Sequence, residues 1–293
     1  WSLDSEHSTP IPGGYRFSSF RRFGDVHLVM VDVRNGRVLA EQERRIVGSD
    51  EWEWIRERCA EPCRHLIIAT PLPVFTPGGI HPLQQWDEAI CQGAWGRVGR
   101  WIGEKVRRGL DTEHWPAFDT SFREMEQLLV DVGTGVGAPE TISVLGGDIH
   151  FSYVIDVERR GGDPFDSRVH QIISSPIRNI LGRKERGAVR FAESRYGRRI
   201  GEFLARRAGR ETSQLRWDVD VNPIFDNTMA LLRFEGDGVH QVRLAQAHAA
   251  VEEQRVEGGG RGGRLGHAAR GGIGQLVRLS DDEAVEMIAL VQL

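Results

Sequence analysis

The sequence predicts an α/β fold, and three observations support this prediction. Near-continuous apolar runs, typical of strands buried on both faces, occupy residues 26–34, 65–70 and 141–145. Segments with apolar residues at helical spacing separate these runs. The resulting order of strand, helix, strand, helices and strand is that of a sheet covered by helices. We therefore expect a parallel or mostly parallel sheet at the centre of the chain.

Composition narrows the class of protein. The chain has 293 residues, of which 40% are hydrophobic, enough to form a real core. Its formal net charge of -4 gives no global attraction to nucleic acid, so no nucleic-acid partner is expected. The apolar runs fall short of the roughly 20 residues of a membrane helix, so no membrane span is expected. Three cysteines without a CxxC pair favour a reducing compartment and hence the cytoplasm: Cys59, Cys63 and Cys91.

The elements follow in order from the N-terminus, where residues 1–14 have the composition of a loop. The first strand, 26–34, ends in Asp32 and Arg34. Asp50, with Glu53 three residues later, has the spacing of a capping box that opens a short helix. The second strand, at 65–70, completes a strand, helix, strand unit.

The middle of the chain is predicted to be a loop and two helical segments. The sequence "PLPVFTPGG" (71–79) contains three prolines and two glycines and predicts a rigid loop. Apolar residues recur at helical spacing over 83–106, although four glycines weaken this segment. The better stripe runs from Phe118 to Leu129, with Pro116 at a first-turn position.

The last third is predicted to hold a strand, a basic helix and a small β unit. The strand is "VHQIISSPI" (169–177), and residues 184–208 read as one amphipathic basic helix. Two alternating segments, "TMALLRFE" and "HQVRLAQA", are joined by "EGDG", which predicts a hairpin, and "QLRWDVDV" precedes them. Residues 252–274 hold nine glycines and few large apolar residues, so this stretch is expected to be disordered.

The strand at 141–145 leads into the first candidate site. It ends at Gly146 and Gly147, and Asp148 and His150 follow. Loops at the carboxyl ends of parallel strands border the crevice where ligands bind. A carboxylate and an imidazole together suit ions such as zinc, iron or manganese. The alternative is ordinary turn chemistry, since Asp and Gly commonly follow a strand.

Arg34 is a second candidate, because a guanidinium can bind a phosphate through two hydrogen bonds. A structural Asp32–Arg34 pair at the strand end explains the same residues equally well. His114 is expected to be a cap or surface residue and His170 a core or edge histidine. The "SSPIRN" segment (174–179) could border an anion site or be a simple turn.

Motifs that are absent from the sequence argue against several enzyme classes, and the role of the basic helix has two readings. The chain has no G-x-S-x-G elbow, P-loop or G-x-G-x-x-G, which argues against serine hydrolases, nucleoside triphosphatases and dinucleotide enzymes. Residues 183–210 carry ten basic and three acidic residues. Such a helix can contact acidic lipid or nucleic acid, but a solvated helix face is the reading we favour.

In series, these segments resemble the carboxyl-terminal portion of the alkaline phosphatase D (PhoD-like) family of metallophosphoesterases. The "MVDVR" segment resembles a family strand ending in Leu-Asp-Thr-Arg, and "GDIH" resembles the metal-binding G-D-V-H. "EHWPAFDTSF" and "QIISSPIRN" also fit, so the likeness covers residues 15–248. It implies a partial four-layer α/β-β/α sandwich with a small C-terminal β hairpin.

The resemblance further implies a metal-dependent phosphoester hydrolase that acts on a small phosphoester. Asp148 and His150 would be ligands of iron, calcium, zinc or manganese ions, and Arg34 a catalytic or phosphate-supporting residue. The family's earlier metal ligands precede the Asp32 strand, where this chain has 25 residues before Val26 and neither pattern. We therefore expect a fragment that is incomplete and inactive alone. The alternative is a non-catalytic binding or structural remnant of that fold.

The same resemblance suggests three parts. Residues 1–180 would be the C-terminal half of the metallophosphoesterase domain. Residues 181–248 would add the basic helix and closing strands of that domain. Residues 249–293 would be a disordered tail rich in glycine and arginine.

Overall fold

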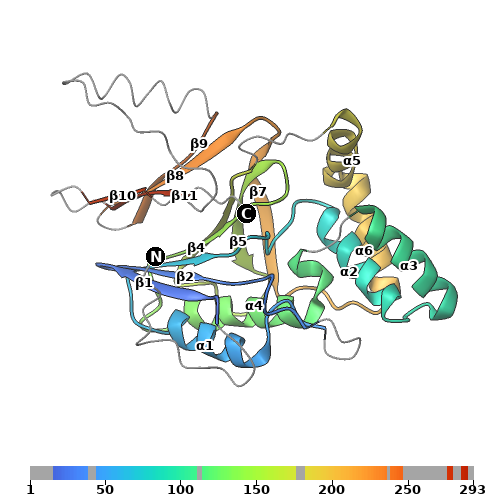
Figure 1. The fold of residues 1–293 in the computed structure, drawn as a ribbon, viewed down its shortest axis with the longest axis horizontal. Helices are drawn as coiled ribbons and strands as arrows, with labels where there is room; N and C mark the ends of the chain where they lie inside the picture. Colours follow the sequence, from blue (N-terminus) through green and yellow to red (C-terminus); the bar gives the residue numbers. More distant parts are fainter. Residues whose placement is uncertain are drawn as a thin grey trace.

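The structure is a mixed α/β fold, so the predicted class is confirmed (Figure 1). This computed structural model describes residues 16–38, 44–110, 114–175, 182–235, 238–246, 276–279 and 285–289. Its main sheet has seven strands in the order β1-β2-β3-β4-β6-β5-β7. Strands β2, β3, β4 and β6 are parallel, and β1 and β5 run against them. The carboxyl ends of the parallel strands therefore share one edge.

The strands of the main sheet have five to ten residues. They are β1 (Ser19–Phe23), β2 (Val26–Met30), β3 (His65–Ala69), β4 (Thr141–Gly146), β5 (Ser152–Arg159), β6 (Arg168–Ile173) and β7 (Leu215–Ile224). The helices are α1 (Ser49–Cys59), α2 (Ile80–Cys91), α3 (Gly96–Leu110), the 3-10 turn η1 (Trp115–Ala117), α4 (Asp119–Gly133), α5 (Arg183–Glu193) and α6 (Arg195–Arg207).

Two hydrophobic cores lie on opposite faces of this sheet. On one face, Ile68 and Val144 pack with Ile55 of α1 and with Phe122 and Leu129 of α4. On the other face, strand residues pack against the second sheet; they are Leu28, Ile67, Leu145, Val154 and Ile172, opposite Ala230, Leu232 and Phe234. Consecutive strand residues thus serve both cores, which explains the unbroken apolar runs. The described residues build helix, sheet and sheet, which are three of the four expected layers.

The second sheet has four strands in the order β10-β11-β8-β9. Its hairpin of β8 (Thr228–Glu235) and β9 (Gly238–Gln246) is antiparallel, as "EGDG" predicted. Its other two strands, β10 (Leu276–Leu279) and β11 (Val285–Ala289), fall in the segment expected to be a disordered tail. That expectation is wrong for these two strands of four and five residues, because their Val, Leu and Ile residues complete a sheet with β8. Residues 252–274 lie outside the described part, and the three-part division stays a prediction.

Three helix predictions need correction. Gly48 caps α1 without a side-chain hydrogen bond, so the Asp50 capping box is wrong and Asp50 lies within the first turn. The stripe over 83–106 is split between α2 and α3 at Gly93, whose φ is 101°. The basic helix is also split, because Ser194 caps α6 by accepting a hydrogen bond from the Gly197 N–H at 3.2 Å.

The helices α2, α3 and α6 form a group beside the sheet (Figure 1). Helix α2 packs against both α3 and α6. It also contacts η1, which in turn contacts α4, and α4 covers the main sheet. No helix among the described residues is both long and apolar enough to cross a membrane.

Candidate functional site

The loop after β4 carries Asp148 and His150 in an unusual backbone conformation. Asp148 has φ of 52° and His150 has φ of 63°, and they are the non-glycine residues with positive φ among those described. Left-handed backbone is unfavourable for residues with a Cβ, and it tends to gather at functional sites. The intervening Ile149 and the following Phe151 are buried, whereas Asp148 and His150 are half-buried. The alternation turns both candidate side chains toward the surface of the sheet edge.

Hydrogen bonds from neighbouring loops hold this conformation. The Gly147 N–H donates to the Pro71 carbonyl at 3.1 Å, and the His150 N–H donates to Ser175 Oγ at 3.2 Å. The Ser175 N–H in turn donates to Ser152 Oγ at 2.9 Å. Ser175 of the "SSPIRN" segment therefore supports the loop. The rest of that segment, from residue 176, lies outside the described residues.

Arg34 reaches the same loop from the end of β2. Its guanidinium forms an ion pair with the carboxylate of Asp148, which is 114 positions away in the sequence. Asp32 stabilises the turn that follows it. Its carboxylate accepts the N–H groups of Arg34 at 3.0 Å, Asn35 at 3.1 Å and Gly36 at 3.2 Å. The alternative of a structural Asp32–Arg34 pair therefore holds only for the Arg34 backbone N–H, because the guanidinium pairs with Asp148 instead. Asp32 thus fixes the backbone of the turn, and this places the Arg34 guanidinium against the Asp148 carboxylate.

Asp148 and His150 are side chains of metal-ligating type, but the described residues do not form a metal centre around them. No group of three or more His, Cys, Asp and Glu side chains suited to a metal occurs in the described ranges. The carboxylate of Asp148 is moreover engaged by Arg34. A metal at Asp148 and His150 would need further ligands and would have to compete with this guanidinium.

A loop, residues 71–79, forms the rim beside the site, as "PLPVFTPGG" predicted, and buried hydrogen bonds hold it. Gln171, buried in β6, accepts the N–H groups of Val74 at 2.9 Å and Phe75 at 2.8 Å. Its Nε2 donates to the Phe75 carbonyl at 2.6 Å, and the Tyr153 hydroxyl donates to the same carbonyl at 2.9 Å. The sequence does not mark Gln171, because a glutamine within an apolar strand has no pattern that names its partner.

The other candidate histidines have structural roles. His170 is buried, and its Nε2 lies 2.9 Å from Ser143 Oγ. Burial, with a smaller contribution from Arg168, lowers the pKa of His170 to about 4. His114 precedes η1, and its Nδ1 lies 2.7 Å from Gln84 Nε2. His170 is thus a core histidine as expected, and His114 occupies the N-cap position of η1 without a capping hydrogen bond from its side chain.

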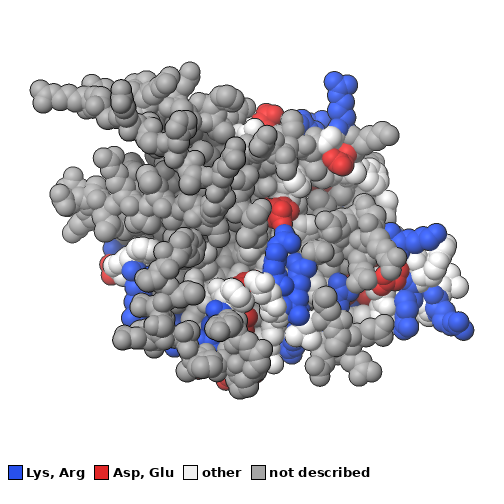
Figure 2. Space-filling model, viewed as in Figure 1, with Lys and Arg blue, Asp and Glu red and all other residues white. Residues whose placement is uncertain are grey.

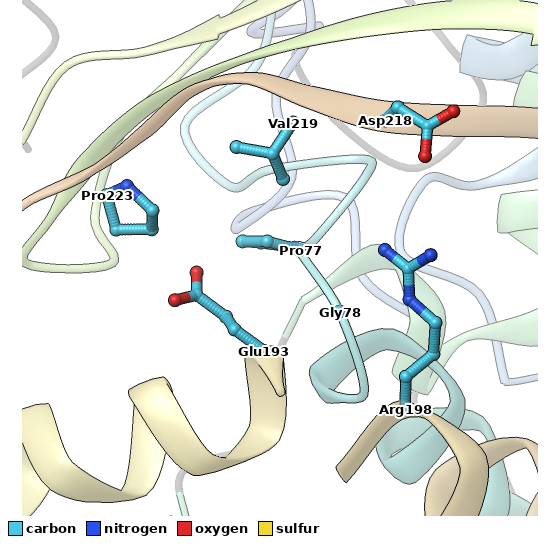
Figure 3. Close-up of a pocket in the computed structure, with 7 residues that line it drawn as sticks. All are labelled: Pro77, Gly78, Glu193, Arg198, Asp218, Val219 and Pro223. Carbon is cyan, nitrogen blue, oxygen red and sulfur yellow. The ribbon is translucent and has the colours of Figure 1, made fainter. Parts of the chain in front are cut away.

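A pocket of about 260 Å³ lies between the rim loop, the junction of α5 and α6, and β7. Figure 3 shows Glu193 beside Pro77 and Pro223, and Arg198 extending toward Asp218. Burial raises the pKa of Glu193 to about 7, and Arg190 partly offsets this shift. Its Oε1 has no hydrogen-bond partner among the described residues. Sequence reasoning missed Glu193, because only the break at Ser194 turns the end of α5 toward the rim loop.

Comparisons with known proteins identify no family for this chain. No protein-family model and no curated protein matches the chain. A solved structure described as "Structure of PhoD" is similar with a TM-score of 0.37 and 10% sequence identity. The likeness covers 57% of this chain and 30% of that one. Because the TM-score is so low, this similarity carries no argument about function.

The strained backbone at His150 leads to a stability prediction. His150→Gly is expected to raise the free energy of unfolding by about 0.5–1 kcal/mol, since glycine adopts positive φ without steric cost. His114→Gly is the matched control, because His114 has an ordinary φ of -76°. That control should lose roughly 1 kcal/mol. Urea unfolding of both variants measures the difference, and equal destabilisation by the two changes would disprove strain at His150.

Proposed function

We propose that the chain is a PhoD-like phosphoester hydrolase and that Arg34, Asp148 and His150 belong to its phosphoester site. The observation that carries the proposal is the ion pair of Arg34 and Asp148 at the carboxyl edge of the sheet. An ion pair of half-exposed side chains contributes little to stability. The strained loop carries Asp148 and the turn at Asp32 carries Arg34, so both are needed to form the ion pair. A strained backbone that adds little stability favours a functional role for this pair.

Arg34 is proposed to bind the phosphate. Its guanidinium is about half exposed, so a phosphate can approach it from solvent and accept two parallel hydrogen bonds. A bound phosphate would compete with Asp148 for the same donors. Arg34 would thus orient the phosphoester at the sheet edge and offset the negative charge that develops on its oxygens.

Asp148 and His150 are proposed as metal ligands, with iron, calcium, zinc and manganese as the candidate ions. A carboxylate oxygen and an imidazole nitrogen are donor types that these ions accept. The two residues flank the buried Ile149; the Ser175 hydroxyl holds the His150 backbone N–H, and Arg34 pairs with the Asp148 carboxylate. The remaining ligands would have to come from outside the described residues.

Hydrolysis of a chromogenic phosphomonoester and phosphodiester tests the proposal. The full-length gene product that contains this chain, first treated with a chelator, is assayed with each candidate ion added in turn. We expect hydrolysis with at least one ion. We also expect kcat/KM to fall by about a hundredfold or more in Asp148→Ala, in His150→Ala and in Arg34→Ala, as when a group that stabilises transition-state charge is removed.

Glu158→Ala is the matched control, because Glu158 is an exposed acidic residue on β5 that pairs with Arg216. This variant should keep the full activity. Undiminished activity in both Asp148→Ala and His150→Ala would show that these residues have no part in the reaction. Absence of hydrolysis by the full-length gene product with every ion would refute the enzyme assignment.

A non-catalytic anion-binding module is the second candidate. The observation that favours it is the engagement of the Asp148 carboxylate by Arg34, which satisfies both charges without a metal. Calorimetric titration with inorganic phosphate distinguishes the two. Binding that depends on Arg34, in a full-length gene product that hydrolyses neither substrate with any ion, would support the module.

A further inference from the structure

Helices α3 and α6 bury glycines against α2 and expose large apolar residues. A Cβ on Gly103 would lie 2.7 Å from Cys91 Sγ of α2, and a Cβ on Gly201 would lie 2.9 Å from Pro82 Cγ of α2. Both helices therefore pack closely against α2 through their smallest residues. This reverses the usual pattern, in which a surface helix turns its large apolar side chains toward the core.

The outward faces carry aromatic and aliphatic residues at helical spacing. On α6, Tyr196, Ile200 and Phe203 occupy one face, with Ile200 49% and Phe203 55% exposed. On α3, Val98 and Trp101 are 71% and 60% exposed. The Trp95 Nε1 donates to the Arg207 carbonyl at 3.3 Å, which joins the start of α3 to the end of α6. The exposed apolar residues are thus concentrated in one helical group rather than scattered singly.

Basic residues accompany these faces. The sequences of α3 and α6 each hold five basic residues and one glutamate, in a chain whose formal net charge is -4. Lys105 Nζ lies 4.0 Å from the Trp101 ring, and the Arg207 guanidinium lies 5.3 Å from the Phe203 ring. Figure 2 shows blue side chains next to white ones at this end of the molecule. The charge of the helical group is therefore opposite to that of the whole chain.

We propose that α3 and α6 dock the protein on an anionic lipid bilayer surface. Aromatic and aliphatic side chains would enter the boundary between headgroups and acyl chains, and the arginines and lysine would contact the lipid phosphates. Positive charge complements an anionic bilayer and would repel a second copy of the same helices. The aliphatic Val98 and Ile200 favour lipid over nucleic acid, because they offer no ring on which a base could stack.

Vesicle co-sedimentation of the full chain tests this proposal. Binding to phosphatidylcholine vesicles is expected to be slight and to increase with the share of phosphatidylglycerol. The double variant Trp101→Ala/Phe203→Ala should lower the partition coefficient by about tenfold or more, since it removes two large apolar groups. Arg199→Gln/Arg206→Gln should lower binding to the anionic vesicles by about tenfold.

Phe17→Ala is the matched control, because Phe17 is an aromatic residue that is 62% exposed outside these helices. It should bind vesicles as the unchanged chain does, and circular dichroism should show that every variant is folded. Equal binding by Trp101→Ala/Phe203→Ala and the unchanged chain would overturn the proposal. It would also be overturned by a dimer that this variant abolishes, or by binding to an oligonucleotide without binding to anionic vesicles.

Discussion

Arg210→Ala is expected to lower the free energy of unfolding by about 3–5 kcal/mol, because it leaves a buried carboxylate without its partner. Arg210 Nη2 lies 2.9 Å from Glu88 Oε2, and the side chains are only 14% and 2% exposed. The same guanidinium reaches Asp119 Oδ2 at 3.1 Å and the Gln85 carbonyl at 3.3 Å. It therefore links the segment after α6 to α2 and to the start of α4. Urea unfolding measures the loss.

Two variants separate this cause from the loss of a surface charge. Arg216→Ala removes an ion pair with Glu158 whose partners are 57% and 64% exposed, so it should change stability by no more than about 0.5 kcal/mol. Adding Glu88→Gln to Arg210→Ala should restore a large part of the loss, because the amide removes the buried charge and keeps an oxygen for the Asp119 N–H. If Arg210→Ala proves as mild as Arg216→Ala, the buried pair is not what holds the helical group in place.

The strands were predictable where both faces are buried. The predicted runs at 26–34, 65–70 and 141–145 correspond to β2, β3 and β4, because residues that serve two cores leave no polar interruption. The helix breaks were harder to predict, because amphipathic spacing continues across them. At the break before α6, a Cβ on Gly79 would lie 2.5 Å from the Gly197 carbonyl, a long-range contact that the sequence alone does not reveal.

The site was predictable in part. A strand followed by two glycines placed Asp148 and His150 at the edge of the sheet, and the structure has them there. Whether they bind a metal stays a prediction. The pairing of Arg34 with Asp148 was not predicted, because it depends on β3 lying between β2 and β4 in parallel register. Spacing along one chain does not fix the order of strands in a sheet.

His81→Leu is expected to raise the free energy of unfolding at pH 7 by about 1–2 kcal/mol, because it removes a buried polar ring that has no hydrogen bond. His81 is 2% exposed and lies against Phe122 and Trp217, with ring centroids 4.6 Å away in each case. Neither ring nitrogen has a hydrogen-bond partner among the described residues. Leucine is apolar and similar in size, so the aromatic surroundings can accommodate it.

The advantage of His81→Leu should grow as the pH falls. Burial, with a smaller contribution from Arg123, lowers the pKa of His81 to about 3 in the folded chain, against an ordinary value near 6.5 in the unfolded chain. Between these values the unfolded chain binds the extra proton, so the original protein loses stability at about 1.4 kcal/mol per pH unit.

Comparison of the two proteins at several pH values isolates this effect, because other groups such as His170 titrate in both. The stability difference should be constant above pH 7 and about 2 kcal/mol larger at pH 5. A difference that stays flat from pH 7 to pH 5 would mean that His81 gains a proton without unfolding. The ring would then have to reach solvent or an acceptor, and the packing of α2 against α4 and β7 would be looser than the ring contacts indicate.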